Sequence, residues 1–369
     1  MSSKIGFWSV FALVAGSQIG SSVFMQPAIL APYGIYAAFG WLISALGAIS
    51  LALTFGWLCG KFPKTGGPYV YVQEAFGKRA AFFAGWTYWM ISWISTPVLY
   101  IATAGYLSPL LKNPSVQVLF LIELFFLTLL TILNLKGVSQ AGKVEFYLSL
   151  LKIIPLVIVP LLALSYFDIN NIMLDHNHPD TQSFSSILGS TALLTLWGFI
   201  GVETATTAAG SVSNPSKTIP KAIFIGTSCV ALLYIVNSIS IMGLIPGIKL
   251  SQSRAPYVDA AQVIFGGNWH LLVSIIAAIT CIGTANAWTL SSGQSALGLA
   301  QDGLLPKFFT RKNKNGAPTF GLLVSFFGII IILLLTMNKS LVTQINNIID
   351  FSVTAFLRSE EHTSELQSH

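Results

Sequence analysis

Long apolar runs separated by short polar segments make up most of this chain. No charged residue occurs between Lys4 and Lys61. A bilayer core about 30 Å thick takes roughly 20 apolar residues as helix, so this first run holds two crossings. Later runs such as 119–133, which holds one charged residue, Glu123, and 320–335 are apolar almost throughout and lack the alternation of membrane-barrel strands. The pattern therefore predicts an all-α membrane protein that crosses the bilayer many times.

Ten spans follow from the apolar runs. We place them at residues 7–33, 36–58, 82–107, 115–134, 146–166, 186–210, 222–245, 270–299, 318–337 and 340–357. The start of the third span stays open, because residues 74–79 could begin a helical extension ahead of it.

The distribution of basic residues predicts an orientation. With the N-terminus in the cytoplasm, only four of the 19 Lys and Arg residues fall in outer loops: Lys112, Lys249, Arg254 and Lys339. Lys152 lies inside a span and Arg358 in the C-terminal segment, and the others face the cytoplasm. Loops rich in Lys and Arg stay on the cytoplasmic side of a membrane. We therefore expect a multi-pass protein of the cytoplasmic (inner) membrane with a cytoplasmic N-terminus.

Composition excludes several classes of protein. Hydrophobic residues make up 54% of the chain and charged residues 9%, against about 25% charged in a soluble domain. The net charge of +6 does not indicate nucleic-acid binding, because the basic residues lie in short loops between spans. The three cysteines show no pair spacing, and no cluster predicts a metal, a cofactor or a catalytic triad. We therefore expect that this protein is not an enzyme.

The last residues differ abruptly from the rest. Residues 358–369 are polar and resemble the translation of a sequencing adapter, so we expect a non-natural tail, with a genuine polar tail as the alternative. Residues 1–357 are then one transmembrane domain. Its two repeats would cover about 5–166 and 186–357.

Two spans contain helix-weakening sequence at matching positions. Glycine and hydroxyl residues interrupt the first span at 16–22 and the sixth at 197–210. Glycine costs up to about 1 kcal/mol inside a helix, and unwound backbone is tolerated at membrane depth only in protein or around a cavity. Free N–H groups at a half-helix suit a carboxylate. Paired breaks in spans one and six predict an inverted repeat with the substrate between them; small-residue helix packing is the alternative.

The chain resembles the amino acid–polyamine–organocation transporter superfamily, and within it the arginine/agmatine antiporter type. The resemblance rests on residues 20–27, 197–205, 214–220, 288–296 and 301–306. It implies a twelve-span parent with a five-plus-five inverted repeat and broken first and sixth helices, of which about ten spans are present. It also implies secondary transport of amino acids or related amines by alternating access, as an exchanger or a proton-coupled symporter. A channel or a substrate sensor that retains the fold is the alternative.

The resemblance implies a substrate site at the breaks. Its residues would be Ile19, Gly20, Ser21, Ser22, Ser92, Thr96, Trp197, Ile200, Gly201 and Trp288. Backbone N–H groups of the first break would bind the substrate carboxylate, carbonyls of the sixth its amino group, and Trp288 a cationic side chain. Trp197, Glu203 and an outer-gate tyrosine, Tyr88, would act as gates.

Three positions depart from the family pattern. Ser22 replaces a glycine, and Thr96 and Ser17 replace asparagines. Arginine/agmatine specificity therefore does not follow from the resemblance.

Two ionisable residues inside spans are candidates for proton coupling, since such residues are costly in a membrane. Glu203 lies in the sixth break, with a structural hydrogen bond to Thr204 or Thr206 as the alternative. Lys152 resembles the lysine with which some proton-coupled members replace sodium between spans one, five and eight. The alternative is that Lys152 reaches the membrane surface. Expected partners are an amino acid or amine, protons and the lipid bilayer; a homodimer stays open, because the parent's last spans are absent.

Overall fold

Nine helical segments of the described chain are long and apolar enough to cross a bilayer. The computed structural model describes residues 4–20, 22–111, 114–173, 184–253, 256–267 and 269–337. Within these ranges the regular secondary structure is helical, apart from two isolated β-bridges. The nine segments match the first nine predicted spans. The predicted tenth span and the predicted tail lie outside the described residues.

Most spans are single helices. The first span consists of α1 (Phe7–Gln18) and α2 (Ser22–Leu30), and the sixth of α8 (Phe184–Leu196), η5 (Trp197–Phe199) and α9 (Thr204–Thr207). The third consists of α4 (Tyr69–Ile94) and α5 (Pro97–Leu107). The others are α3 (Tyr36–Lys61), α6 (Val116–Leu135), α7 (Val138–Ala163), α10 (Pro215–Leu244), α13 (Trp269–Gln301) and α14 (Thr319–Thr336). Two short helices, α11 (Gly247–Ser251) and α12 (Pro256–Phe265), connect α10 to α13.

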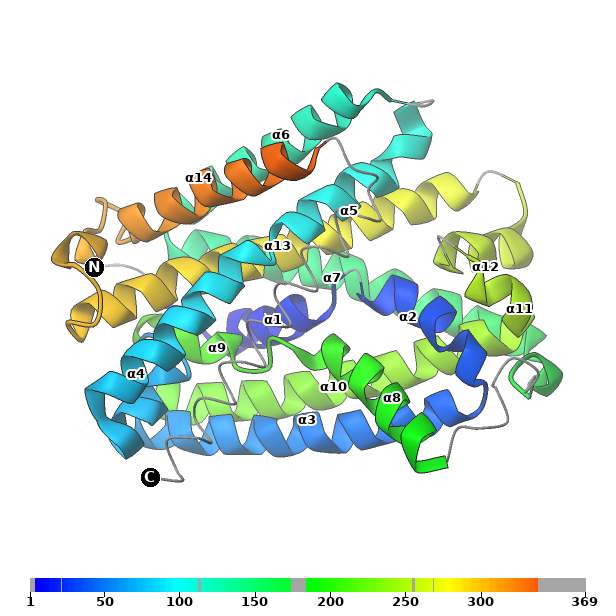
Figure 1. Cartoon of the computed structure of the whole chain (residues 1–369), viewed down its shortest axis with the longest axis horizontal. Coiled ribbons are helices and arrows are strands. Elements are labelled where there is room, and N and C mark those ends of the chain that lie inside the picture. The colour runs from blue at the N-terminus through cyan, green and yellow to red at the C-terminus, as the bar shows by residue number, and fades with distance from the viewer. Residues whose placement is uncertain are drawn as a thin grey trace.

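Both predicted helix breaks are confirmed. The first span stops being helical at Gln18 and resumes at Ser22, and the sixth unwinds between Phe199 and Thr204. Gly201 has a φ of 110°, a conformation that side-chain-bearing residues rarely adopt. In Figure 1 the α1–α2 pair lies in the middle of the molecule, where α1 packs against α7, α10 and α13. The first break is therefore enclosed by protein.

The fifth span begins earlier than predicted. The helix α7 starts at Val138, directly after Gly137 with its φ of 104°, and not at residue 146. The polar residues Lys143 and Glu145 suggested a loop, but Lys143 is exposed and Glu145 is buried. The two side chains leave the helix on different sides, so both fit within one helix. Glu145 therefore lies inside the fifth span.

The third span also begins earlier. Helix α4 starts at Tyr69 rather than at residue 82 and bends at Gly77, whose φ is 82°. This earlier start agrees with the alternative left open above, in which residues 74–79 belong to a helical extension ahead of the third span. Tyr69 packs against Gly85 of the same helix, because a Cβ added to Gly85 would lie 3.0 Å from the Tyr69 Cβ. The segment before the bend therefore folds back on the span.

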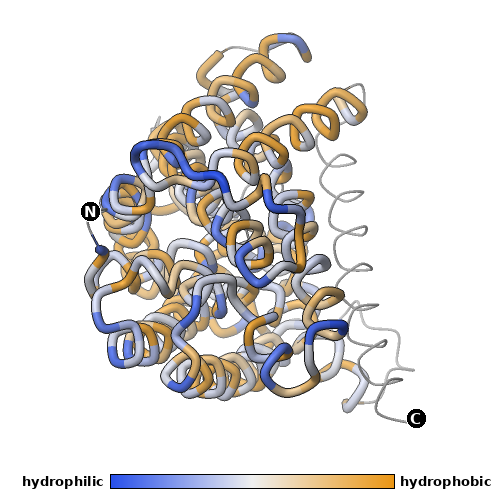
Figure 2. The backbone as a smooth tube through the Cα atoms, turned by 90° about the vertical axis from the view of Figure 1, so that its left-hand side faces the viewer, coloured by the Kyte–Doolittle hydropathy of each residue, from blue (hydrophilic) through white to orange (hydrophobic). Residues whose placement is uncertain are grey.

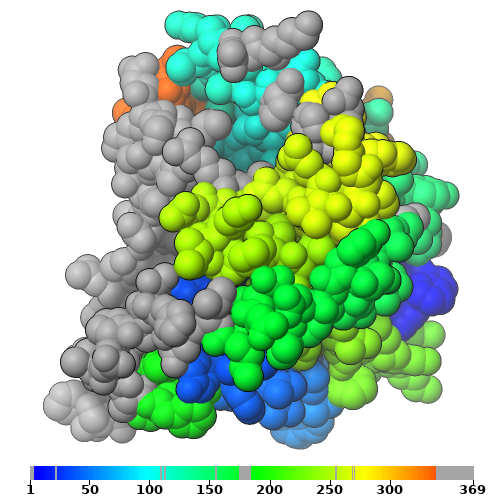
Figure 3. Space-filling view, turned by 90° about the vertical axis from the view of Figure 1, so that its right-hand side faces the viewer, coloured from blue at the N-terminus to red at the C-terminus, as the bar shows by residue number. Residues whose placement is uncertain are grey.

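Large apolar side chains cover the outer faces of the spans. Leu46 of α3, Leu121 of α6, Leu193 of α8 and Leu335 of α14 are each more than 60% exposed. Monomeric soluble proteins rarely expose so much apolar surface, whereas lipid covers it in a membrane. In Figure 2 hydrophobic residues follow the helices and hydrophilic ones gather in connections. The N-terminus lies at one end, and Figure 3 shows the opposite end, where α11 and α12 form part of the surface.

Candidate functional site

The two helix breaks lie against each other. The Ser17 hydroxyl at the end of α1 donates to the Gly201 carbonyl, 3.0 Å away, and lies 2.8 Å from the Thr204 hydroxyl oxygen. A Cβ added to Gly201 would lie only 2.8 Å from Ser17 Oγ. The positive φ and this close approach both require glycine at position 201. Unwound backbone from two distant parts of the chain therefore meets at one place.

Neighbouring helices satisfy the carbonyl groups that the first break leaves free. The Thr284 hydroxyl of α13 lies 2.6 Å from the Ile19 carbonyl oxygen and 3.0 Å from that of Gly16. Tyr234 of α10 donates to the Gln18 carbonyl at 2.6 Å. The last carbonyls of a helix have no partner within it, and buried ones must find partners elsewhere. Side chains of α10 and α13 therefore stabilise the unwound end of α1.

Lys152 of α7 lies beneath the same break. Its Nζ is 2.8 Å from the Gly16 carbonyl oxygen and 3.2 Å from that of Ile19. It also lies 3.6 Å from Glu145 Oε1, and both side chains are completely buried. A Cβ added to Gly283 of α13 would lie 3.2 Å from this nitrogen. Lys152 therefore lies between spans one, five and eight and does not extend to the membrane surface.

Glu145 was missed in the sequence, because the predicted fifth span began at residue 146, directly after it. Its Oε1 accepts a hydrogen bond from Ser149 at 3.2 Å, and its Oε2 accepts one from Asn286 of α13 at 2.8 Å. The signal that could have found it is spacing. Glu145, Ser149 and Lys152 are four and three residues apart, so they share one helix face.

A second group lies on the adjoining face of α13. Trp288 belongs to a hydrophobic cluster against which Tyr88 of α4 and Ile200 of the sixth break pack. The Tyr88 hydroxyl donates to Glu203 Oε1 at 3.1 Å and lies 3.3 Å from Ser291 Oγ. Thus Tyr88, Ile200, Glu203 and Trp288, all predicted from the sequence, are brought together. The group combines a carboxyl group with aromatic rings.

Tyr88 lies near the connection between the second and third spans. A Cβ added to Gly67 would lie 3.8 Å from a Tyr88 ring carbon and 3.0 Å from Thr207 Cγ2. Gly67 belongs to the connection between the second and third spans, at the end where the N-terminus lies. Whether Tyr88 is an outer gate depends on which side of the membrane this end faces, so that role stays a prediction.

Other predicted residues lie apart from these contacts. The buried hydroxyls of Ser92 and Thr96 donate to backbone carbonyls of α4, both at 2.7 Å. Trp197 opens η5 and is half-buried, and its carbonyl oxygen accepts a hydrogen bond from the Ile200 N–H at 3.4 Å. Ser21 lies outside the described residues, and Ser22 is the first residue of α2.

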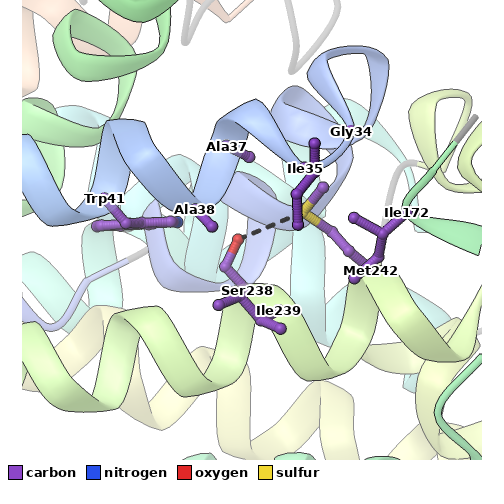
Figure 4. A pocket seen from close by; sticks show the side chains of 9 residues that line it. All are labelled: Gly34, Ile35, Ala37, Ala38, Trp41, Ile172, Ser238, Ile239 and Met242. Carbon is purple, nitrogen blue, oxygen red and sulfur yellow. Dashed lines mark hydrogen bonds between the residues drawn. The ribbon is translucent and has the colours of Figure 1, made fainter. Parts of the chain in front are cut away.

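The cavity in Figure 4 is not this site. It lies mainly between α3 and α10 and has a volume of about 20 Å³. Its lining is mostly apolar: Gly34, Ile35, Ala37, Ala38, Trp41, Ile172, Ser238, Ile239 and Met242. A cavity of this size holds roughly one water molecule, far less than an amino acid.

Comparison with known proteins identifies the family. The amino acid permease family matches residues 5–357 of this chain. The chain belongs to this family. As an amino acid permease it is a multi-pass membrane protein and a secondary transporter, not an enzyme. The resemblance to the amino acid–polyamine–organocation superfamily is confirmed.

Two curated transporters are similar to this permease. The cadaverine/lysine antiporter of Escherichia coli is 33% identical over 329 residues, which cover 87% of this chain and 72% of that protein. The putrescine transporter PotE of Haemophilus influenzae is 30% identical over 354 residues, covering 95% and 81%. Relatives that are antiporters and transporters support a carrier and give no support to a channel or a sensor.

A solved structure supports the fold independently of sequence. A sodium-coupled sialic acid symporter in a substrate-bound outward-open state superposes with a TM-score of 0.64. The match covers 96% of this permease and 76% of that chain at 12% sequence identity. The broken-helix transporter fold is therefore shared at low sequence identity.

Proposed function

We propose that this permease exchanges a cationic amino acid for a related amine. The observation that carries this proposal is the Glu203 carboxyl group, hydrogen-bonded to Tyr88, beside the cluster that contains Trp288. A carboxylate and aromatic ring faces both favour a cation. The similar proteins, a cadaverine/lysine antiporter and a putrescine transporter, are named for such substrates.

The proposed substrate contacts are at the two breaks. The substrate carboxylate binds N–H groups at the start of α2, where the helix dipole favours an anion. Carbonyl groups of the sixth break receive the amino group, and the side-chain cation lies near Trp288. The other proposed contacts are Ile19, Gly20, Ser21, Ser22, Ser92, Thr96, Trp197, Ile200 and Gly201.

The proposed gates act by alternating access, with Tyr88 and Glu203 on the side of the N-terminus and Trp197 over the substrate. Backbone hydrogen bonds on that side join the residues just before α1 to those just after the sixth span: Ile5 N to the Ser211 carbonyl oxygen and Ser213 N to that of Ile5, both 2.9 Å. Opening this side requires that these bonds break. The N-terminus is proposed to be cytoplasmic, and protons are proposed to couple through Glu203 and Lys152.

Counterflow in liposomes tests the exchange. We would reconstitute the protein and measure uptake of radiolabelled lysine, cadaverine, putrescine, arginine, leucine and glutamate, with and without internal substrate, at two pH values. Uptake of cations that requires internal cation is the expected result, since an exchanger cannot complete its cycle empty. Equal uptake into empty vesicles, or preference for leucine or glutamate, would refute the proposal.

A matched pair of variants tests the site. Trp288→Leu should weaken cation uptake, because it removes the ring proposed to face the cation. Trp86→Leu is the control. Trp86 of α4 is 40% exposed and lies near other exposed apolar side chains of that helix, away from the proposed site. If both variants take up cations as the unaltered protein does, Trp288 does not bind substrate.

A further inference from the structure

The buried pair of Glu145 and Lys152 has a complete set of partners. Lys152 Nζ meets the carboxylate and the carbonyls of Gly16 and Ile19. The carboxylate meets Lys152, Ser149 and Asn286. Two charges removed from water are tolerated only when such partners compensate for lost hydration. The arrangement is therefore a constructed site and not a chance contact of two side chains.

The pair also lies directly against the backbone of α1. A Cβ added to Gly16 would collide with Glu145 Oε1. Ser149, which donates to Glu145, lies 3.2 Å from the Ala12 carbonyl oxygen as well. The ammonium group faces the carbonyl end of α1, where the helix dipole is negative. A change in the charge of the pair therefore changes the electrostatic potential at the carbonyl groups of the first break.

The net charge of the pair depends on its protons. With one proton between carboxylate and amine, the pair is neutral, whichever atom holds that proton. With two, it is a protonated carboxyl beside an ammonium group, and its net charge is +1. Among the described residues packed around it, α1 contributes backbone carbonyls, and α13 contributes one titratable group, the buried Cys281, which interacts electrostatically with Lys152.

We propose that Glu145 and Lys152 together form a proton-loaded cation site, in which Glu145 takes up the proton. Binding forms an O–H bond on the Glu145 carboxyl, and Lys152 keeps its proton. The site then presents a net positive charge to the carbonyls of the first break, as a bound metal cation would. Release of that proton restores the neutral pair.

Infrared difference spectroscopy tests where the proton goes, without any substrate. Acidifying the purified protein should produce a protonated-carboxyl band that is missing in Glu145→Gln. Glu123→Gln is the matched control, because Glu123 is a buried acid of α6. The control should keep the band assigned to Glu145. A difference spectrum unchanged by Glu145→Gln would overturn the proposal.

Melting temperatures test the pairing itself. Glu145→Gln and Lys152→Met should each lower the melting temperature, and the double variant should regain part of the loss, because removing one charge leaves the other buried and unpaired. If the double variant loses as much melting temperature as the two single variants together, Glu145 and Lys152 do not stabilise each other and the pairing is wrong.

Exchange assays test the consequence for transport, which rests on the proposed function. Occupancy of one proton site changes about tenfold over two pH units centred on its midpoint. Glu145→Gln mimics the loaded site, so its exchange should lose the pH dependence that the unaltered protein and Glu123→Gln show, and sodium should not change it. A Glu145→Gln profile equal to that of the unaltered protein would overturn the proposal. Failure of the unaltered protein to exchange refutes the proposed function alone, since the infrared and melting tests need no substrate.

Discussion

Replacing Gly201 by alanine should strongly destabilise the meeting point of the two breaks. The φ of 110° at this residue would cost a side-chain-bearing residue about 1–3 kcal/mol. The new Cβ would also lie 2.8 Å from Ser17 Oγ and 3.0 Å from Ser17 Cβ. Moving Ser17 disturbs its hydrogen bonds to Gly201 and Thr204, worth about 1 kcal/mol. The total is about 2–4 kcal/mol, or roughly 30-fold or more in the ratio of folded to unfolded protein.

Thermal melting in detergent and counterflow in liposomes measure the outcome. The control is Gly189→Ala in α8, where a Cβ would meet nothing within 4 Å. At this helical site alanine should raise stability by about 0.4–1 kcal/mol. We expect the Gly201→Ala protein to melt at a lower temperature than the unaltered protein and to lose exchange. The Gly189→Ala control should melt at a higher temperature. A Gly201→Ala protein that melts and exchanges like the unaltered one would refute the close contact of the breaks.

Three further substitutions test single contacts. Thr284→Val should lower stability by about 1–3 kcal/mol, seen as a lower melting temperature, because it removes the hydroxyl that faces two carbonyls of the first break. Tyr88→Phe should slow counterflow and destabilise the protein by a similar amount, since Glu203 loses its donor; unchanged counterflow would argue against a gate here. Lys64→Ala should change stability by less than about 1 kcal/mol, because its ion pair with Glu74 is exposed. The hydrogen bond from Lys64 to Glu74 raises the pKa of Lys64 in the folded protein. The small stabilisation is therefore present at neutral pH and is lost as the pH rises through the pKa of Lys64 in the folded protein. Melting curves at neutral and at strongly alkaline pH check this loss.

The breaks could be predicted from local sequence, whereas their partners could not. Clustered glycines weaken a helix wherever it lies, so residues 16–22 and 197–210 indicated unwinding without a structure. Nothing local showed that Ser17 would meet Gly201, or that Thr284 would face the Ile19 carbonyl. Such contacts join residues far apart in the chain, and they depend on how the helices cross.

Glu145 shows a different limit. A carboxylate beside an exposed Lys143 has the composition of a loop, and apolar length alone placed the span after it. Its burial follows from its rotation about the helix axis and from two partners: Lys152, about two turns further along the same helix face, and Asn286 of α13. A polar residue can lie deep in a helical membrane protein when other elements supply its partners.

The sequence by itself determined that this protein is a helical membrane protein with two broken spans, because hydrophobic length and glycine clusters act locally. Its resemblance to a transporter superfamily indicated transport. It also identified Tyr88, Ile200, Glu203 and Trp288 before their contacts were known. Only the tertiary structure decided that Tyr88 lies on the side of the N-terminus, that Lys152 is fully buried, and that Glu145 is its partner. Those features depend on which helix faces meet, and side chains distant in sequence become neighbours only when the helices pack.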